Sequence, residues 1–271
     1  MDDTLALRAR WAIVDSWTVV VQEMTHLVRQ PANFAWQLGF PIVMVLLFVY
    51  VFGSAMDVSG HGAGTGYLDY AMPGLFAMTM AFGFMNTALA VAITKEKGFI
   101  DRFRSMPMAS SAVVTGRGVA DLLHATVDLV ILAVIAVVLG WRPGGSTAAT
   151  LSAFALLLWL RLALIFVGIH LGLLVKNTET AGNLFALAFP FGMISSVFAP
   201  PGLMPGWLGT IAAWNPVSST AGAIRDLFES PPVESGYWIE GHAVAAAIVW
   251  PAVILAVFLP LAVRRYQRLS R

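Results

Sequence analysis

The chain has 271 residues, of which 58% are hydrophobic and 11% are charged, and its mean hydropathy is +0.78. Soluble domains carry about 25% charged residues, so this composition predicts an integral membrane protein. The net charge of +1 leaves no basic surface for neutralising phosphates, which argues against a nucleic-acid-binding protein. The absence of cysteine excludes disulfides, thiolate metal sites and cysteine nucleophiles.

The first 30 residues mix apolar positions with charges and hold no continuous apolar core, so they do not resemble a cleavable signal peptide. Trp11 and Trp17 in this stretch are typical of a helix that lies in the membrane interface. We therefore expect a cytoplasmic interfacial helix over residues 1–30. A solvated amphipathic helix packed on the protein is the alternative.

Six stretches are apolar enough to cross a bilayer, which takes about 20 residues each. They lie at residues 32–53, 71–94, 118–140, 149–175, 181–199 and 243–263. The fifth is short and contains Pro190. The sequence thus predicts an all-α integral membrane protein with six transmembrane helices. It forms one domain over residues 1–271, with a membrane region at 31–265 and a cytoplasmic tail at 266–271.

The distribution of cations predicts the orientation of these spans, because cytoplasmic loops carry an excess of Lys and Arg. Thirteen of the 16 cations fall on the side of the two termini: Arg8, Arg10, Arg29, Lys95, Lys97, Arg102, Arg104, Arg117, Lys176, Arg264, Arg265, Arg268 and Arg271. Both termini and the stretch from Lys95 to Gly116, which we call the charged segment, are therefore expected in the cytoplasm.

The long outer stretch from Pro200 to His242 is apolar and aromatic in its first half but is broken by Pro205 and Pro216. Broken apolar helices at membrane depth need protein around them. We therefore expect short interfacial or re-entrant helices on the outer side, after the fifth span.

The charged segment is predicted to contain a short amphipathic helix from Glu96 to Met106. Phe99, Ile100, Phe103 and Met106 fall on one face of such a helix, and Pro107 ends it. A helix lying across the membrane surface between two spans can push on both when a partner pushes on it. The alternative is an anchored loop whose charges only set the topology.

Several stretches resemble the membrane subunits of ABC type-2 transporters of the daunorubicin-resistance permease type. The most specific is TKEKGFIDRFRSMPMASSAVVTGRGVAD, which is similar to the family's run EKG-x-x-x-R-x-R-x-x-P followed by GR-x-x-AD. VRQPANFAWQLGFPIVMVLLFVYVFGSA, YAMPGLFAM, LGLLVKNTETAG and VFAPPGLMPGWLGTIAAWNPVSSTAGAIRDLF resemble other parts of the same family. The resemblance covers roughly residues 28–265.

The resemblance implies a six-helix half-transporter that pairs with a second permease subunit, either a copy of this chain or a relative, and with two cytoplasmic ATPase subunits. The helix beginning at Glu96 would then contact the ATPase and transmit its closure. The residues implied in this coupling are Glu96, Gly98, Phe99, Arg102, Phe103, Arg104 and Pro107. The resemblance also implies a location in the plasma membrane, which in a bacterium is the inner membrane.

The lysines of the chain exclude a phosphate-binding loop of its own. Such a loop ends in Gly-Lys-Ser/Thr, whereas Lys95, Lys97 and Lys176 follow Thr94, Glu96 and Val175. If ATP drives the protein, a partner must bind the ATP and its Mg²⁺. The chain itself is then a transport subunit rather than an enzyme, with no catalytic, cofactor or metal site in its sequence.

A second group of candidate residues lies inside the spans. Asp121, His124 and Asp128 share one face of the third span, and Arg161 and His170 lie in the fourth. A charge at the bilayer centre costs roughly 2.5 to 3.5 kcal/mol on insertion scales, so such groups normally find partners. We expect Asp128 and Arg161 to form a buried ion pair. Packing without a transport role and a proton relay are the alternatives.

The leading functional hypothesis is the permease subunit of an ATP-driven exporter that moves a hydrophobic drug, lipid or glycolipid outward through the lipid membrane. A lipid-linked polysaccharide is the alternative cargo. Two alternative hypotheses come from other functional classes. A proton-coupled carrier would use the intramembrane Asp and His residues without ATP, and a membrane scaffold would transport nothing. The sequence does not specify the cargo.

Overall fold

The structure is a computed structural model that describes residues 39, 42–47, 65–98, 110–230 and 236–269. Every regular element within these ranges is a helix. The α-helices are α3 (Thr65–Glu96), α5 (Ser110–Val138), α6 (Thr147–Leu174), α7 (Thr178–Met193), α8 (Gly206–Trp214), α9 (Pro216–Leu227) and α10 (Ala243–Leu269). Two short 3₁₀ helices, η2 (Pro201–Leu203) and η3 (Glu240–His242), lie between them, and residues 42–47 are also helical.

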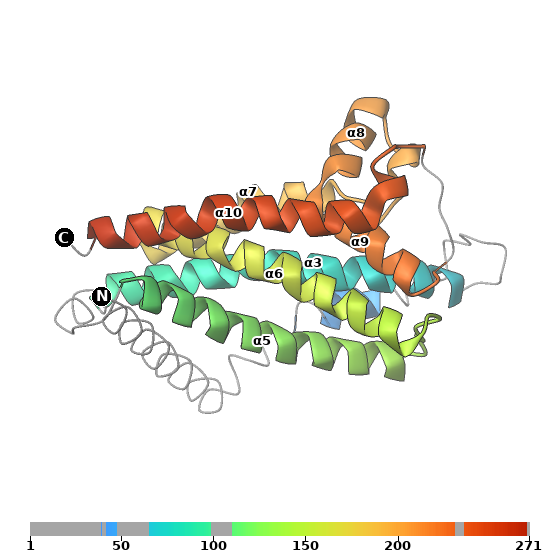
Figure 1. Ribbon diagram of the computed structural model, residues 1–271, viewed down its shortest axis with the longest axis horizontal. Coiled ribbons are helices and arrows are strands. Elements are labelled where there is room, and N and C mark those ends of the chain that lie inside the picture. The colour runs from blue at the N-terminus through green and yellow to red at the C-terminus, as the bar shows by residue number, and fades with distance from the viewer. Residues whose placement is uncertain (1–38, 40–41, 48–64, 99–109, 231–235, 270–271) are drawn as a thin grey trace, which may run out of the picture.

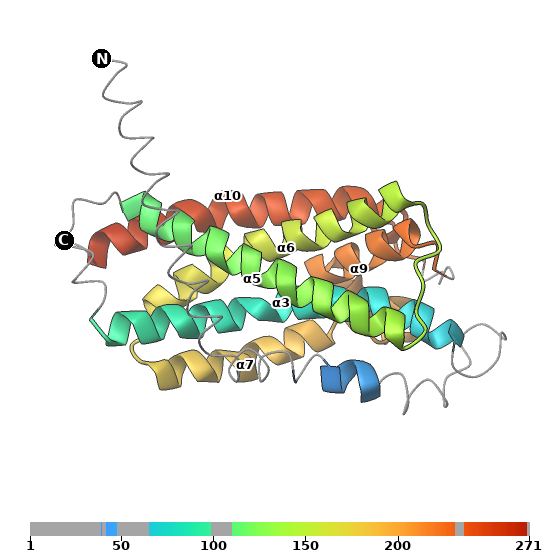
Figure 2. The ribbon, with the colours of Figure 1, turned by 90° about the horizontal axis from the view of Figure 1, so that it is seen from below.

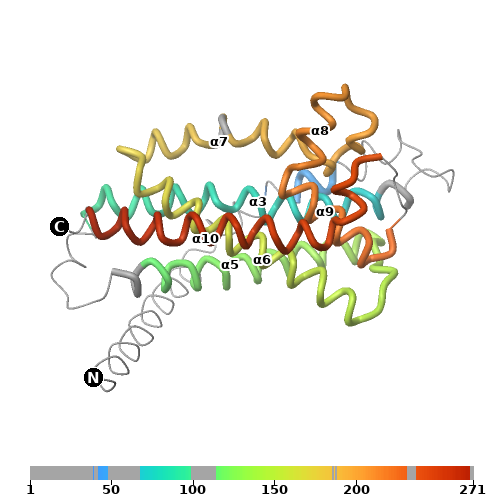
Figure 3. The backbone as a smooth tube through the Cα atoms, turned by 45° about the horizontal axis from the view of Figure 1, so that its top comes forward, coloured from blue at the N-terminus to red at the C-terminus, as the bar shows by residue number. Residues whose placement is uncertain are grey.

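The five longest helices run side by side along the long axis of the molecule (Figure 1). Figure 2 shows α7 at one edge of the bundle and α10 at the other, with α3 and α6 between them. The contacts agree, since α3 packs against both α6 and α7, and α10 packs against α6. In Figure 3, α8 and α9 are grouped at one end of this bundle.

The two ends of the bundle differ in charge. The last turns of α3, α6 and α10 and the first turns of α5 and α7 lie together at one end (Figure 1), which we call the basic end. The described cations there are Lys95, Lys97, Arg117, Lys176, Arg264, Arg265 and Arg268. The opposite end holds α8 and α9, and we call it the Arg225 end. The structure therefore brings together the cations that the sequence assigns to one side, while the side itself remains a prediction.

In the part of the chain that the structure describes, four helices are long and apolar enough to cross a membrane: Leu68–Glu96, Val114–Val138, Thr147–Leu174 and Glu240–Arg268. They correspond to the second, third, fourth and sixth predicted spans. The first predicted span lies mostly outside the described residues. The fifth corresponds to α7, a helix of 16 residues that contains Pro190. The total of six spans therefore remains a prediction.

The helices extend beyond the apolar stretches from which they were predicted. α3 begins at Thr65 rather than near residue 71, and α5 begins at Ser110, inside the charged segment. A helix satisfies its own backbone hydrogen bonds, so it continues through polar residues at the membrane surface until a breaking signal ends it. The stretch from Ser110 to Gly116 is thus the first turns of α5.

Small residues bring α3 and α6 into close contact at the centre of the bundle. A side chain on Gly168 would collide with the carbonyl oxygen of Phe84, and one on Gly172 with that of Ala88. Close backbone approach through small residues is the usual way in which membrane helices gain packing contacts. Four methionines of α3, Met72, Met78, Met80 and Met85, are each at most 7% exposed, so they pack inside this chain.

Candidate functional site

At the basic end, the last turn of α3 is fastened to the end of α6. Lys95 Nζ donates hydrogen bonds to the carbonyl oxygens of Val175 (2.8 Å) and Leu173 (3.3 Å). The last carbonyls of any helix have no partner within the helix, and cations are favoured there. Lys95 therefore serves as a cap for α6 that is supplied by a different helix.

The next residue of α3 contacts the beginning of α7. Glu96 Oε2 accepts a hydrogen bond from the Thr178 backbone N–H (3.3 Å), and the Asn177 side chain accepts from the Thr180 N–H (2.9 Å). Both acceptors lie at the N-terminus of α7, where N–H groups lack helical partners and negative charge is favoured. Lys95 and Glu96 together form what we call the α3 clamp, which holds the end of α6 and the start of α7.

Gly98 allows the chain to leave α3 immediately after the clamp. Its φ angle of 70° lies in the left-handed region, which glycine adopts without the steric penalty of a Cβ atom. Its N–H donates to the carbonyl of Lys95 (3.1 Å), as at many helix C-termini. Of the predicted coupling residues, the structure thus describes Glu96 and Gly98. Phe99, Arg102, Phe103, Arg104 and Pro107 lie outside the described residues.

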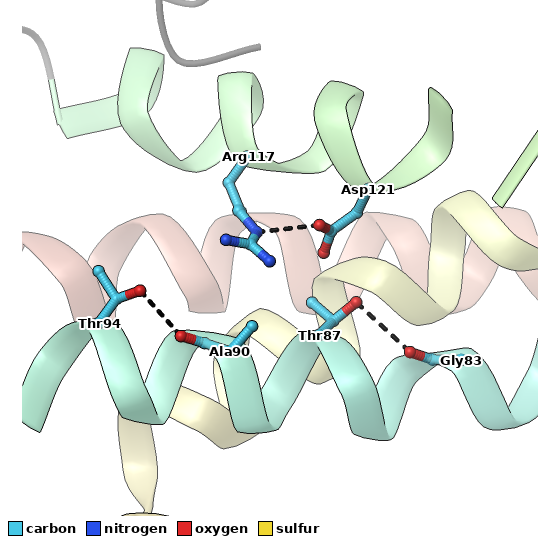
Figure 4. A network of polar contacts seen from close by, with 6 residues as sticks. All are labelled: Gly83, Thr87, Ala90, Thr94, Arg117 and Asp121. Carbon is cyan, nitrogen blue, oxygen red and sulfur yellow. Dashed lines mark hydrogen bonds and ion pairs between the residues drawn. The ribbon is translucent and has the colours of Figure 1, made fainter. Parts of the chain in front are cut away.

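A cluster of buried charges lies between α5, α6 and α3. Asp121, Asp128 and Arg161 are 4%, 9% and 5% exposed, respectively. Asp121 Oδ1 forms an ion pair with Arg117 Nε at 2.9 Å, and Figure 4 shows both side chains pointing from α5 toward α3. The charged residues predicted in the third and fourth spans are thus buried within the protein.

Arg161 of α6 extends toward α3 and occupies the space beside Gly83, where any larger residue would collide with its guanidinium. The carboxylates of Asp121 and Asp128 both act electrostatically on it. The predicted ion pair between Asp128 and Arg161 stays a prediction. Charges buried this far are costly unless they interact with one another.

The two predicted histidines lie in different surroundings. His124 is half-buried on α5, next to the acidic residues of its own helix. His170 instead packs edge-on against Phe258 of α10, with 5.8 Å between the ring centroids. The structure therefore does not bring His170 into the group formed by Asp121, Asp128 and Arg161.

At the opposite end, Arg225 of α9 organises the chain between α7 and η2. This side chain is 9% exposed. Its Nε donates to the Tyr70 carbonyl (3.0 Å), and its Nη2 donates to the carbonyls of Ser196 (2.9 Å) and Val197 (3.3 Å). The guanidinium also lies 4.0 Å from the centre of the Tyr70 ring, a cation–π contact. Arg225 thus ties α9, α3 and the end of α7 together.

Asn215, immediately before α9, fixes the same region from the other side. Its side-chain N–H groups donate to the carbonyls of Phe191 (2.9 Å) and Ile194 (2.8 Å), and its Oδ1 accepts from the Val217 N–H (2.9 Å). Pro216 then occupies the first position of α9, where a missing N–H costs nothing. The sequence pattern predicts no role for Asn215 or Arg225, although an arginine within an apolar outer segment indicates a buried cation that needs partners.

The family of the chain is decided by a match over residues 15–228 to the family model described as "ABC-2 type transporter". The chain belongs to the ABC-2 type transporter membrane family. The matched region includes the α3 clamp, the buried charge cluster and the Arg225 contacts. The chain is thus a multi-pass membrane protein of the permease class, whose members work with separate ABC ATPase subunits.

Proteins similar to this ABC-2 chain include permeases whose names refer to drug resistance or multidrug transport. It is 27% identical over 258 residues to the daunorubicin resistance ABC transporter permease protein DrrB1 of Streptomyces coeruleorubidus, covering 92% of this chain and 87% of that one. It is 24% identical over 226 residues to the putative transport permease ycf38 of Porphyra purpurea, covering 78% and 75%. It is 27% identical over 154 residues to the probable multidrug ABC transporter permease YbhR of Escherichia coli K12, covering 56% and 41%.

Proposed function

We propose that this chain is the permease subunit of an exporter that moves a hydrophobic drug, lipid or glycolipid out of the cell. ATP and Mg²⁺ would be bound by two cytoplasmic ATPase subunits, and a second permease subunit, a copy or a relative, would complete the pathway. The proposal rests on the family of the chain and on one structural observation, the α3 clamp. The names of the DrrB1 and YbhR relatives favour a drug-like cargo.

The α3 clamp supplies a physical route from the charged segment to the bundle. The charged segment begins with Lys95 and Glu96, which hold the end of α6 and the start of α7. A partner that pushes on the segment would therefore move three helices at once rather than one loop. This favours a coupling role for Phe99, Arg102, Phe103 and Arg104, with Gly98 and Pro107 setting the shape of the contact.

The test is co-purification of the full chain from its source membranes with a soluble ATPase that carries a phosphate-binding loop. The double variant Phe103→Ala, Arg104→Ala is expected to lose the ATPase, while Arg268→Ala at the same basic end keeps it. ATP-dependent accumulation of a lipophilic dye in inverted vesicles should fall in parallel. Retention of the ATPase by the double variant would contradict the coupling role.

The buried Asp121 and Asp128 favour one second candidate, a carrier driven by protons through these acids. Dye accumulation in the same inverted vesicles distinguishes the proton-driven carrier from the ATP-driven exporter. A carrier would accumulate the dye when only a pH gradient is imposed, and Asp121→Asn would abolish that uptake. The exporter instead requires ATP whatever the gradient.

A further inference from the structure

Arg161, near the centre of α6, is a buried cation whose bonding capacity is not used among the described residues. Its side chain is 5% exposed, and its Nη1 has no hydrogen-bond acceptor there. The ion pair between Arg117 and Asp121 in the same cluster does not include it. A buried donor without an acceptor destabilises a fold, most of all when it is charged. A second arrangement that gives Arg161 an acceptor would therefore compete with the one in the structure.

The guanidinium of Arg161 lies in a notch on α3 that exists because residue 83 is glycine. A Cβ atom at Gly83 would collide with the Nη1 and Cζ atoms of Arg161. Closer to the basic end, the two helices touch through backbone, since a side chain on Gly168 of α6 would meet the carbonyl oxygen of Phe84 on α3. At the notch, the contact between α3 and α6 is instead made by the far end of one charged side chain.

An acceptor for this guanidinium lies on α5. Asp121 is 4% exposed, and its Oδ1 pairs with Arg117 Nε at 2.9 Å, whereas its Oδ2 has no hydrogen-bond donor within the described ranges. Of the two carboxylates that act electrostatically on Arg161, Asp121 has the larger effect and Asp128 the smaller. Figure 4 shows the Asp121 side chain directed from α5 toward α3, the helix that carries the notch. A buried charged donor and a buried charged acceptor thus interact without a bond between Nη1 and Oδ2.

We propose that Arg161 exchanges between two positions, the notch beside Gly83 and an ion pair with Asp121. In the first position the centre of α6 is held to α3, and in the second it is held to α5. The exchange begins as a change of side-chain rotamer, which needs no prior movement of a helix. Because Lys95 joins the ends of α3 and α6, the exchange would let these two helices separate at their centres while their ends stay together. It is a property of the bundle, whatever the protein transports.

The first test is a double-variant cycle on the thermal unfolding of the full chain in nanodiscs. Gly83→Ala fills the notch and should lower the unfolding midpoint by less than about 2 °C, because Arg161 has its second position. A drop as large as that of Gly168→Ala, whose methyl group meets backbone, would overturn the proposal. Adding Asp121→Asn to Gly83→Ala should lower the midpoint by about 4 to 8 °C beyond the sum of the two single effects, because both positions are then lost. Additive effects would also overturn it, since internal water would then suffice for Arg161.

Asp121→Glu is the matched control, because it keeps the carboxylate and should show no extra loss when combined with Gly83→Ala. An equal extra loss in this variant would refute a role for the charge.

The second test measures the separation of the helices and does not require Asp121→Asn to fold. The chain has no cysteine, so spin labels can be attached through Asn86→Cys on α3 and Ala155→Cys on α6, two exposed positions. Pulsed EPR should give two distances between the labels, and Gly83→Ala should raise the population at the longer distance about twofold or more. One unchanged distance in both proteins would overturn the proposal. Neither test uses ATP, so their outcome is independent of the proposed export function.

Discussion

Replacing Lys95 by methionine would remove the cation that caps α6 while keeping a similar chain length. Two hydrogen bonds from a charged group are lost, one of 2.8 Å to Val175 and a longer one of 3.3 Å to Leu173. Hydrogen bonds to charged groups contribute about 1.5 to 3 kcal/mol, and the longer bond is the weaker. If the shorter bond contributes within this range and the longer one adds little, Lys95→Met should lower the free energy of unfolding by about 2 kcal/mol.

The measurement is the thermal unfolding midpoint of the chain in one detergent, followed by the intrinsic fluorescence of its tryptophans. A loss of about 2 kcal/mol corresponds to a midpoint lowered by roughly 4 to 8 °C in a protein of this size. Lys95→Arg, which keeps a donor and the charge, should recover part of the loss. Lys97→Met is the matched control, because Lys97 is exposed and changes at such sites usually stay within about 0.5 kcal/mol.

The same variant tests the transmission of movement in the proposed exporter. Lys95→Met should bind the partner ATPase as the unmodified chain does, yet move less cargo for each ATP hydrolysed, because the charged segment is then joined less firmly to α6. If Lys95→Met and Lys97→Met unfold at the same temperature, the α3 clamp contributes nothing and the reasoning is wrong.

Three further predictions concern the rest of the bundle. Arg225→Leu removes the hydrogen bonds from the guanidinium to the carbonyls of Tyr70, Ser196 and Val197, of which the Ser196 carbonyl keeps the Tyr70 hydroxyl as a donor. The substitution should lower the free energy of unfolding by about 3 kcal/mol, and Arg225→Lys should lower it by less. An unfolding midpoint within 1 °C of the unmodified chain, roughly 0.5 kcal/mol, would contradict this. Gly168→Ala places a methyl group against α3 and should cost about 1 to 3 kcal/mol in thermal unfolding, whereas Gly182→Ala, which has nothing within 4 Å of the added atom, should be neutral or stabilising. Asp128→Ala should lower the yield of folded protein in size-exclusion chromatography, and exchanging the charges of Asp128 and Arg161 should restore it; failure of that rescue would reject the predicted ion pair.

The sequence predicts the parts of this fold that depend on local pattern. Within the described residues, the second, third, fourth and sixth apolar stretches are helices, and the short fifth stretch with Pro190 is a helix of 16 residues. Pro205 and Pro216 mark the starts of α8 and α9. These features follow from the length of an apolar run or from the missing N–H of proline, both of which can be read from neighbouring residues.

The contacts that position the candidate sites depend on residues far apart in the chain. Lys95 bonds to carbonyls 78 and 80 residues away, and a backbone carbonyl leaves no mark in the sequence. In the same way, a helix face of serines, a glycine and an arginine resembles a face in contact with water. The burial of that face on α9 follows only from how Tyr70 of α3 and the α7–η2 connection fold over it.

The length of α7 has a consequence for the lipid around the protein. Its 16 residues rise about 24 Å, whereas the hydrocarbon core of a bilayer is about 30 Å thick. The chain leaves the helix at Ile194 and continues through Ser195 and Ser196, whose polar groups are bonded within the protein. If α7 crosses the bilayer as the sequence predicts, it presents a shorter apolar wall than α6 or α10. A short span can be accommodated by local thinning of the bilayer, which would lower the distance over which a lipophilic molecule has to travel between leaflets.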